Sequence, residues 1–453
     1  MQLFKFQEIR ITIALTIPLL ASFLAQKGMQ LIDTIMMGWI GPEALAAAAL
    51  GTGIFMTSVM FCRGVLSATG VFIARARGAE QTDDVKSCLQ QSVYVALMLS
   101  LPCMLLIWAA PYILTLLGQQ VIIVANAKAL LYGLIWGVPG FLLFFVYREF
   151  ISAFSLMRVV MFVTLISIPL TFVANYVLIY GKLGLPALGV AGIGYASALV
   201  MWFMFLCLWV YSKKHPHLKP HLIRKKWVLE SKMITEILSV GVPTGIISVL
   251  DNLMFLMAVI LVGYFGVVAL AAFQIAMQCI TIAFNVPMAF AITTSLQVGH
   301  ALGAGDFNKA RRIAWLGLML GLLASMLTVM PFLFVPEVLA KLFLKINEAN
   351  YQQIINAATT FLLIAALFQC FDAVQAVTNG ILRGFKDTLI PMLYSIACYL
   401  VIGIGGGYYL AFHTHLGAIG VWYALTLAII SAACLLIWRF LQRLRRKEKG
   451  NLQ

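Results

Sequence analysis

The chain has 453 residues, of which 62% are hydrophobic and only 10% are charged. Soluble domains carry roughly 25% charged residues, so this composition excludes an ordinary soluble protein and places most of the chain in a membrane. The formal net charge of +15 would suit a nucleic-acid-binding protein. However, the Lys and Arg residues lie in short segments between apolar runs, where they set the topology of a membrane protein.

Twelve apolar runs follow one another along the chain, and about 20 such residues suffice to cross a bilayer. In chain order the runs are 10–38, 45–74, 86–116, 121–150, 158–180, 188–212, 233–262, 268–298, 310–335, 353–382, 388–412 and 417–440. We therefore predict an all-α integral membrane protein with twelve transmembrane helices.

The first run carries a proline, Pro18, and two charged residues, Lys27 and Asp33. A charge at membrane depth is costly unless it faces a partner or water. We therefore expect this helix to line an interior cavity rather than to face lipid.

The plan of the first run returns 225 residues later, in the seventh run, which carries its own acid, Asp251. The aligned pairs are Pro18 and Pro243, Gly38 and Gly263, Gly41 and Gly266 and, with an offset of 228, Gly189 and Gly417, and Gly192 and Gly420. Each half then holds six spans, an even number that gives both halves one orientation. We predict two six-helix lobes related by a pseudo-two-fold axis along the membrane normal, with a cavity between them.

The predicted domains are an amino-terminal six-helix lobe (1–211), a cytoplasmic linker (212–232), a carboxy-terminal six-helix lobe (233–442) and a basic cytoplasmic tail (443–453). If the amino terminus is cytoplasmic, twenty-five Lys and Arg residues lie on the inner side, four on the outer side and two, Lys27 and Arg63, within spans. This asymmetry predicts that both termini of this multi-pass protein are cytoplasmic.

Thirteen of the sixteen acidic residues lie near helix ends or in loops, where we expect water to solvate them. The other three, Asp33, Asp251 and Asp372, lie well inside spans and are candidate functional groups. Such a carboxylate can hold a proton, sodium or an organic cation, and competition at one acid couples their movements. The alternative is an acid that only fixes helix packing through an interhelical hydrogen bond.

Other polar residues give weaker indications. Asn175, in the fifth run, can ligate a cation, orient Asp33 or simply join two helices. Methionine and aromatic residues at helical spacing either form an adaptable drug pocket or pack against neighbouring helices. The candidate cavity-lining residues are Lys27, Met29, Met36, Asn252, Phe284, Phe368 and Gln375.

Several other functions lack a sequence signal. There is no Walker A motif, so we do not expect ATP to drive the chain, and no nucleophile–base constellation suggests an enzyme. The eight cysteines lie mostly within apolar runs and are interpreted as buried hydrophobic residues. His215, His217 and His221 of the linker could bind a metal, but the linker is short and basic, so we expect neither a metal site nor a cofactor.

The sequence resembles the multidrug and toxic compound extrusion (MATE) family, and its NorM-like branch in particular. The matching strings are LIDTIMMG (31–38), NYVLIYG (175–181), FDAVQ (371–375) and GILRGFKD (380–387). This resemblance implies two six-helix lobes in a bacterial cytoplasmic (inner) membrane. It also implies export of cationic, lipophilic compounds in exchange for Na⁺ or H⁺.

Carried over by position, the resemblance implies that Asp33 is the amino-lobe cation acid, with Asn175 beside it. It implies that Asp251 and Asp372 are the carboxy-lobe pair. The chain departs from the branch at two points, because Asp251 stands where Glu is common and Phe368 where Tyr is frequent. The shorter acid and the lost hydroxyl leave the choice between Na⁺ and H⁺ open.

We predict a monomeric secondary multidrug exporter that works by alternating access on cationic drugs or toxic metabolites and binds no nucleic acid. The alternative is a flippase for lipid-linked precursors on a related two-lobe plan, which would need a cationic cavity for a pyrophosphate group. Three acids within spans, against Lys27 and Arg63, favour the exporter. A membrane-embedded enzyme is disfavoured because no catalytic cluster is present.

Lys27 has no counterpart in the family resemblance. It lies six residues from Asp33, about 240° around the helix, so the two side chains do not share a face. The alignment of the halves places Lys27 near the depth of Asp251. We predict either that Lys27 pairs with Asp251 when the outer cavity is closed or that it points into a hydrated cavity.

Overall fold

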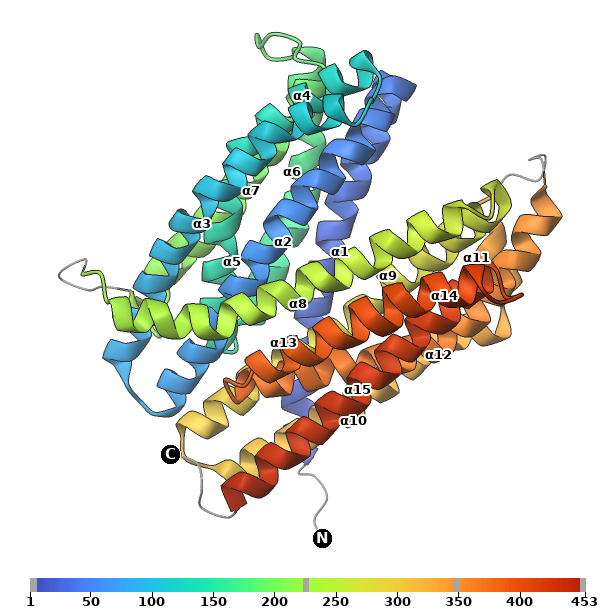
Figure 1. Ribbon diagram of the computed structural model, residues 1–453. Helices are drawn as coiled ribbons and strands as arrows, with labels where there is room; N and C mark the ends of the chain where they lie inside the picture. Colours follow the sequence, from blue (N-terminus) through green and yellow to red (C-terminus); the bar gives the residue numbers. More distant parts are fainter. Residues whose placement is uncertain (1–5, 223–227, 345–349, 449–453) are drawn as a thin grey trace. The chain divides into compact units, whose positions relative to one another are not determined.

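A computed structural model describes residues 6–222, 228–344 and 350–448 (Figure 1). Parts of the predicted linker and of the basic tail, together with Lys5, lie outside these ranges. Within the described ranges, eleven helices are long and apolar enough to cross a membrane, and a bent helix pair brings the total to twelve. The prediction of twelve transmembrane helices is therefore confirmed.

The helices of the first half are α1 (Phe6–Ile40), α2 (Pro42–Gly78), α3 (Thr82–Leu116), α4 (Val121–Ile135), α5 (Val138–Ala153), α6 (Met157–Tyr180) and α7 (Val190–Lys214), followed by a 3₁₀ turn, η1 (Lys219–His221). With 35 residues at about 1.5 Å per residue, α1 is longer than the ~30 Å hydrocarbon core. It begins four residues before the predicted run 10–38 and ends two residues after it.

The helices of the second half are α8 (Ser231–Gly263), α9 (Val267–Gly303), α10 (Phe307–Phe334), α11 (Pro336–Lys341), α12 (Tyr351–Gly384), α13 (Leu389–Ile396), η2 (Ala397–Gly405), α14 (Gly406–Phe412) and α15 (Ala418–Glu448). The eleventh span is made of α13, η2 and α14 in succession, and η2 is a π-helix. The sequence predicted this span as one uniform helix.

The fourth span bends by 49° between α4 and α5. Pro139 lies in the first turn of α5, where its missing N–H costs no helical hydrogen bond. Gly137 lies at the break because α7 passes close by, and a Cβ atom there would lie 2.8 Å from the Cα of Ala198. The indole of Trp202 donates to the carbonyl of Trp136 at 2.9 Å, which binds the bend to α7.

The repeat detected in the sequence is also present in the backbone. Residues with left-handed φ occur in corresponding turns of the two halves: Gly41 and Gly266, Glu80 and Gly305, Ser155 and Lys386, and Gly189 and Gly417. Gly192 and Gly420 are close-contact positions, because a Cβ atom on either would lie 2.7 Å from the carbonyl oxygen of Leu178 or Leu410. The two halves thus have positive φ at corresponding turns and the same close helix contact.

The chain forms two compact units. One, here called the amino-terminal unit, holds Ile17–Gly245 and Gly303–Gly305, and the other, the carboxy-terminal unit, holds Met1–Thr16, Ile246–Leu302 and Asp306–Gln453. The first turns of α1 belong to the carboxy-terminal unit, where Thr12 donates to Gln297 at 3.0 Å and Glu8 pairs with Arg312 at 3.2 Å.

Aromatic rings fill the core of the carboxy-terminal unit around Trp422 of α15, which is completely buried. The rings of Phe273, Phe361 and Phe368 lie 5.0, 6.0 and 6.3 Å from it, centroid to centroid. Phe368, a predicted cavity-lining residue, is therefore part of this core.

Candidate cation-binding sites

Asp33 of α1 is the centre of a polar site in the amino-terminal unit. The amide of Asn175 in α6 donates to one carboxylate oxygen at 2.7 Å, and the hydroxyl of Ser197 in α7 donates to the other at 3.3 Å. Asn175 is completely buried, and its Oδ1 atom has no hydrogen-bond partner among the described residues. An unpaired buried acceptor is costly, and beside a carboxylate it suits a bound cation.

The close contact between α6 and α7 positions Ser197 beside Asp33. Gly192 lets the backbone of α7 approach Leu178 of α6, as described above. Ser197 follows about one and a half turns later and faces Asp33. The sequence analysis singled out Asp33 and Asn175, which the structure brings together, but it did not identify Ser197.

A second site lies in the carboxy-terminal unit, where Asp251 of α8 and Asp372 of α12 are close enough for their charges to repel each other. Both carboxylates also act on the hydroxyl of Tyr399, a completely buried residue of η2. The amide nitrogen of Gln375 in α12 donates to that hydroxyl. The structure thus brings together three predicted residues and adds Tyr399.

Tyr399 provides a hydroxyl in this unit, whereas position 368 has none because it is Phe. Phe368 packs edge-on against Trp422 and carries no polar atom. Tyr399, in η2 of another span, has a hydroxyl on which the charges of both carboxylates act. π-helical turns are rare and are frequent at functional sites. Gly403 of η2 faces Met254 of α8, where a Cβ atom would lie 2.9 Å from the sulfur, so η2 packs against α8 close to Asp251.

Unpaired polar atoms accumulate near this second site. Gln369 lies three residues before Asp372, on the same side of α12, and is completely buried. Among the described residues, neither polar atom of Gln369 has a hydrogen-bond partner, and the same holds for Oε1 of Gln375. Buried polar atoms are normally paired, so these groups suit a bound ion or water.

The remaining cavity candidates differ in their placement. Met29 and Met36 are buried, which places them in packing contacts, while Phe284 is half-buried. Lys27 and Asn252 are exposed. That these residues contact drugs stays a prediction, and so does the pairing of Lys27 with Asp251.

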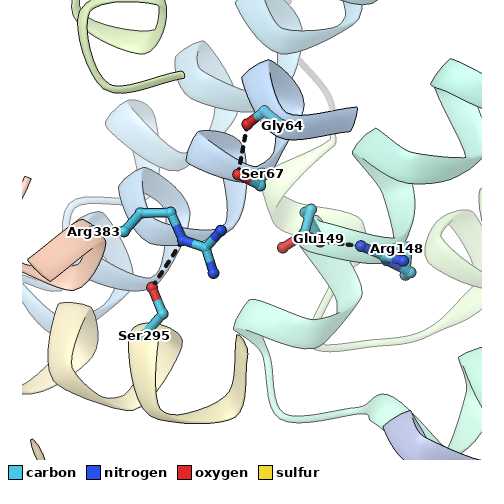
Figure 2. Close-up of polar contacts among 6 residues, drawn as sticks. All are labelled: Gly64, Ser67, Arg148, Glu149, Ser295 and Arg383. Carbon is cyan, nitrogen blue, oxygen red and sulfur yellow. Dashed lines mark hydrogen bonds and ion pairs between the residues drawn. The ribbon is translucent and has the colours of Figure 1, made fainter. Parts of the chain in front are cut away.

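Two acids expected to be solvated are buried instead. Glu149 is only 2% exposed and forms an ion pair at 2.6 Å with Arg148, which is 4% exposed (Figure 2). The expectation was wrong because α5 continues to Ala153, beyond the predicted end of its run, and both residues lie in its buried part. A buried charge persists when a partner compensates its desolvation.

Asp387, in the turn after α12, is the second buried acid. Arg439 and Arg443 of α15 both donate to its Oδ2 atom, Arg439 at 2.8 Å. Burial alone would raise the pKa of Asp387, but the hydrogen bonds and charges of the two arginines outweigh it and lower that pKa. This ion cluster binds the turn to the last helix.

Comparison with known families identifies the repeat. The MatE family model matches residues 18–177 and matches again at residues 243–409. The two matched segments begin at Pro18 and Pro243, the aligned prolines of the two halves. The chain belongs to the MatE family.

Relatives of this MatE chain match it along nearly its full length. It is 32% identical over 441 residues to multidrug resistance protein NorM of Aliivibrio fischeri, covering 95% of each chain. It is 35% identical over 427 residues to a probable multidrug resistance protein NorM of Pseudomonas aeruginosa, covering 94% of this chain and 88% of that one. The predicted resemblance to the MATE family and its NorM-like branch is confirmed.

Solved structures show the same fold. The eukaryotic MATE transporter AtDTX14 superposes with a TM-score of 0.87 at 20% identity, covering 98% of this chain and 99% of that one. A MATE transporter in the bent conformation gives a TM-score of 0.88 at 20% identity, covering 98% of each. The MatE chain is therefore a multi-pass membrane protein with the two-lobe fold of MATE transporters.

Proposed function

We propose that this MatE chain is a secondary multidrug exporter that exchanges cationic, lipophilic drugs for Na⁺ or H⁺ by alternating access. The names of its NorM relatives support the drug-export part of the proposal. The coupling of export to Na⁺ or H⁺ is supported by the neighbouring carboxylates of Asp251 and Asp372 in the carboxy-terminal unit.

Two nearby carboxylates in a medium of low dielectric constant repel each other strongly. The pair is therefore stable only when a positive charge offsets at least one of the negative charges. A proton, a sodium ion or the ammonium group of a drug can each supply that charge. Because these ligands compete for the same oxygens, binding of one favours release of another, which is the basis of exchange.

The hydroxyl of Tyr399 and the unpaired carbonyl oxygen of Gln375 add neutral oxygens around the pair. Hard cations prefer oxygen ligands, so this set suits Na⁺ as well as a shared proton. Asp33, with the free oxygen of Asn175 beside it, is a second cation site in the amino-terminal unit.

In the proposed cycle, cations from outside occupy or protonate the acids and displace the drug outward. The lobes then close and reopen to the cytoplasm, where the cation leaves and a new drug binds. The excess of Lys and Arg in the predicted inner loops supports a bacterial inner-membrane protein with both termini in the cytoplasm.

Purified protein in liposomes tests this proposal. Ethidium transport is measured under an imposed Na⁺ gradient and then under an imposed H⁺ gradient, one at a time. We expect one gradient to drive transport in the wild type and to fail in Asp372→Asn. Glu337→Gln is the matched control, because Glu337 is an exposed acid outside the spans. A rate of ethidium transport that depends on neither gradient would contradict the proposal.

A further inference from the structure

A cavity of about 420 Å³ lies at the ends of several helices of the amino-terminal unit, on the side that the charge asymmetry predicts to be the inner one. Its walls come from the turn between α2 and α3, from the residues that follow α5, and from the segment after α7 that holds η1. All three histidines of the predicted linker, His215, His217 and His221, line it. We call it the histidine cavity.

Short-range structure positions these histidines. His215 caps the end of α7, where its backbone N–H donates back into the helix at 2.9 Å. The 3₁₀ turn η1 then follows, and Leu218, just before it, is completely buried and anchors it. The ring of His221 lies 4.9 Å from that of Phe154, and the rings of His215 and His217 lie 5.6 Å apart, centroid to centroid.

Two of these imidazoles have an unpaired nitrogen. The Nδ1 atoms of His215 and His221 are buried and have no hydrogen-bond partner among the described residues. Buried polar atoms are normally paired. Because an imidazole nitrogen that carries a proton is a donor, both positions suit an oxygen atom of a ligand in the cavity.

Arg77, near the end of α2, adds a permanent positive charge to the lining. Its Nη1 atom donates to the carbonyl of Ala153 at 2.9 Å, and its guanidinium carbon lies 5.1 Å from the ring centroid of Phe154. A guanidinium has five N–H donors, so this bond leaves donors for a ligand. With the repeat offset of 225, Leu302 stands at the aligned position of the second half. The shared turn therefore does not itself require a cation there.

The charges around the cavity favour an anion. Among the described lining residues, Glu80 is the one acid, and it is exposed. Burial lowers the pKa of His221 below its usual value, and the positive charges of Lys86, which pairs with Asp83 at 3.0 Å, and of Arg77 lower it further. The potential at His221 is therefore positive. A bound anion would offset this potential and favour the protonated imidazole, so binding of the anion and of a proton should support each other.

The shape and lining of the cavity favour a phosphate group among anions. Its donors come from separate segments of the chain, which suits the tetrahedral arrangement of phosphate oxygens, and arginine is well suited to phosphate recognition. Val85, Phe154 and Leu156 add apolar surface, and anionic phospholipids are common in the cytoplasmic leaflet of membranes. The volume leaves room for a group attached to the phosphate.

We propose that the histidine cavity binds a phosphate group, carried either by an anionic phospholipid headgroup or by a small soluble phosphate compound. Arg77, His215 and His221 contact the phosphate oxygens, and the apolar lining contacts the carbon atoms beside them. This inference goes beyond the proposed export of drugs, because the cavity shares no residue with the two cation-binding sites.

Calorimetric titration of the purified full-length protein tests the inference with three probes: inorganic phosphate, dihexanoylphosphatidylglycerol and acetate. The first is free phosphate, the second is a phosphodiester with short acyl chains, and the third is a carboxylate control. We expect both phosphate probes to bind saturably and in competition with each other, and acetate to bind more weakly than either. Tighter binding of the lipid would identify a headgroup as the source, whereas tighter binding of inorganic phosphate would identify a soluble compound.

The pH dependence adds a second readout. The phosphodiester keeps one negative charge between pH 6 and pH 8, so a change in its affinity reports on the protein. Because histidine gains its positive charge in this range, we expect the affinity for the lipid to rise about threefold or more from pH 8 to pH 6.

Matched variants locate the binding. His221→Phe keeps a ring beside Phe154 but removes both nitrogens, and it should weaken both phosphate probes about threefold or more near pH 6, as should His215→Gln. Arg77→Gln removes a permanent charge and should weaken them about tenfold or more. The control His413→Gln, at an exposed histidine after α14 in the other unit, should bind like the wild type. If Arg77→Gln fails to fold, the two histidine variants decide.

Two results would overturn the inference: no saturable binding of either phosphate probe to the wild type, or binding that the cavity variants leave unchanged. Binding of Zn²⁺ that the histidine variants lose, with no binding of phosphate, would also overturn it and would assign the cavity to a metal. These titrations do not measure drug transport, so failure of this inference and failure of the proposed function are distinguishable.

Discussion

The hydroxyl of Tyr399 gives the most specific prediction, because no pattern in the sequence marks this residue as part of a site. Tyr399→Phe removes one oxygen and little volume. Gln375 then keeps a buried amide donor without its acceptor. The charges of the two carboxylates act on this hydroxyl, so they also lose a polar group from their surroundings.

The free-energy cost of each loss follows from the interaction that Tyr399→Phe removes. A buried donor left without a partner costs about 1–3 kcal/mol, which should lower the midpoint of thermal unfolding. One hydrogen bond or ligand contact contributes about 0.5–1.5 kcal/mol, which is roughly a two- to tenfold change in apparent ion affinity. The ion affinity should therefore change measurably while the protein still folds.

The assay is the coupling-ion concentration that gives half-maximal drug efflux from proteoliposomes. With Na⁺ as the ion, this concentration should rise, because Na⁺ loses an oxygen ligand. With H⁺, the required proton concentration should fall, because the charged carboxylates lose a polar group from their surroundings. Tyr408→Phe is the control, since Tyr408 is 53% exposed on the same span. A half-maximal concentration equal to that of the wild type would refute a role for Tyr399 at the ion site.

Three further predictions concern acids. Asp33→Asn keeps the shape and hydrogen bonding of the side chain but removes its charge, so we expect normal expression and lost gradient-driven efflux; wild-type efflux would argue against a role for Asp33. Neutralising Asp251 or Asp372 singly should cost nearly as much as neutralising both, with a coupling of about 0.5–3 kcal/mol in a double-mutant cycle of transport, whereas additive losses would indicate separate sites. Burial alone would raise the pKa of Asp387, but its arginine partners lower it below the unfolded value of about 3.9. Its stabilisation is thus complete above about pH 4 and is lost as the pH falls through the folded pKa. The unfolding midpoint of Asp387→Asn should therefore lie below that of the wild type at pH 7, with a gap that closes in acid; a gap independent of pH would contradict this.

Much of the fold follows from hydrophobicity and from the spacing of special residues. Runs of apolar residues predict spans, and Pro18 and Pro243 mark the same position in two halves, which the family match also uses as its two starting points. The acid Asp33 and its partner Asn175 were found because polar groups are rare at membrane depth. Their hydrogen bond in the structure places them in one site.

Other features could not be read from the sequence, because they depend on which helices meet. Nothing in the sequence distinguishes Ser197 from other small residues, and it joins the site only because α7 packs beside α1 and α6. The π-helix around Tyr399 could not be predicted, because its residues are as hydrophobic as those of an α-helical span. Arg148 and Glu149 look like solvated charges near the end of a span. Their burial follows from the length of α5 and from their pairing, neither of which has a local pattern.

In the proposed exchange, drug and ion share the acids and therefore move in opposite directions. The most direct test imposes a drug gradient across proteoliposomes with no ion gradient and records the ion flux. We predict a saturable flux of Na⁺ or H⁺ against the direction of drug movement in the wild type, and none in Asp372→Asn. Drug movement without any counterflow of either ion would contradict the exchange mechanism.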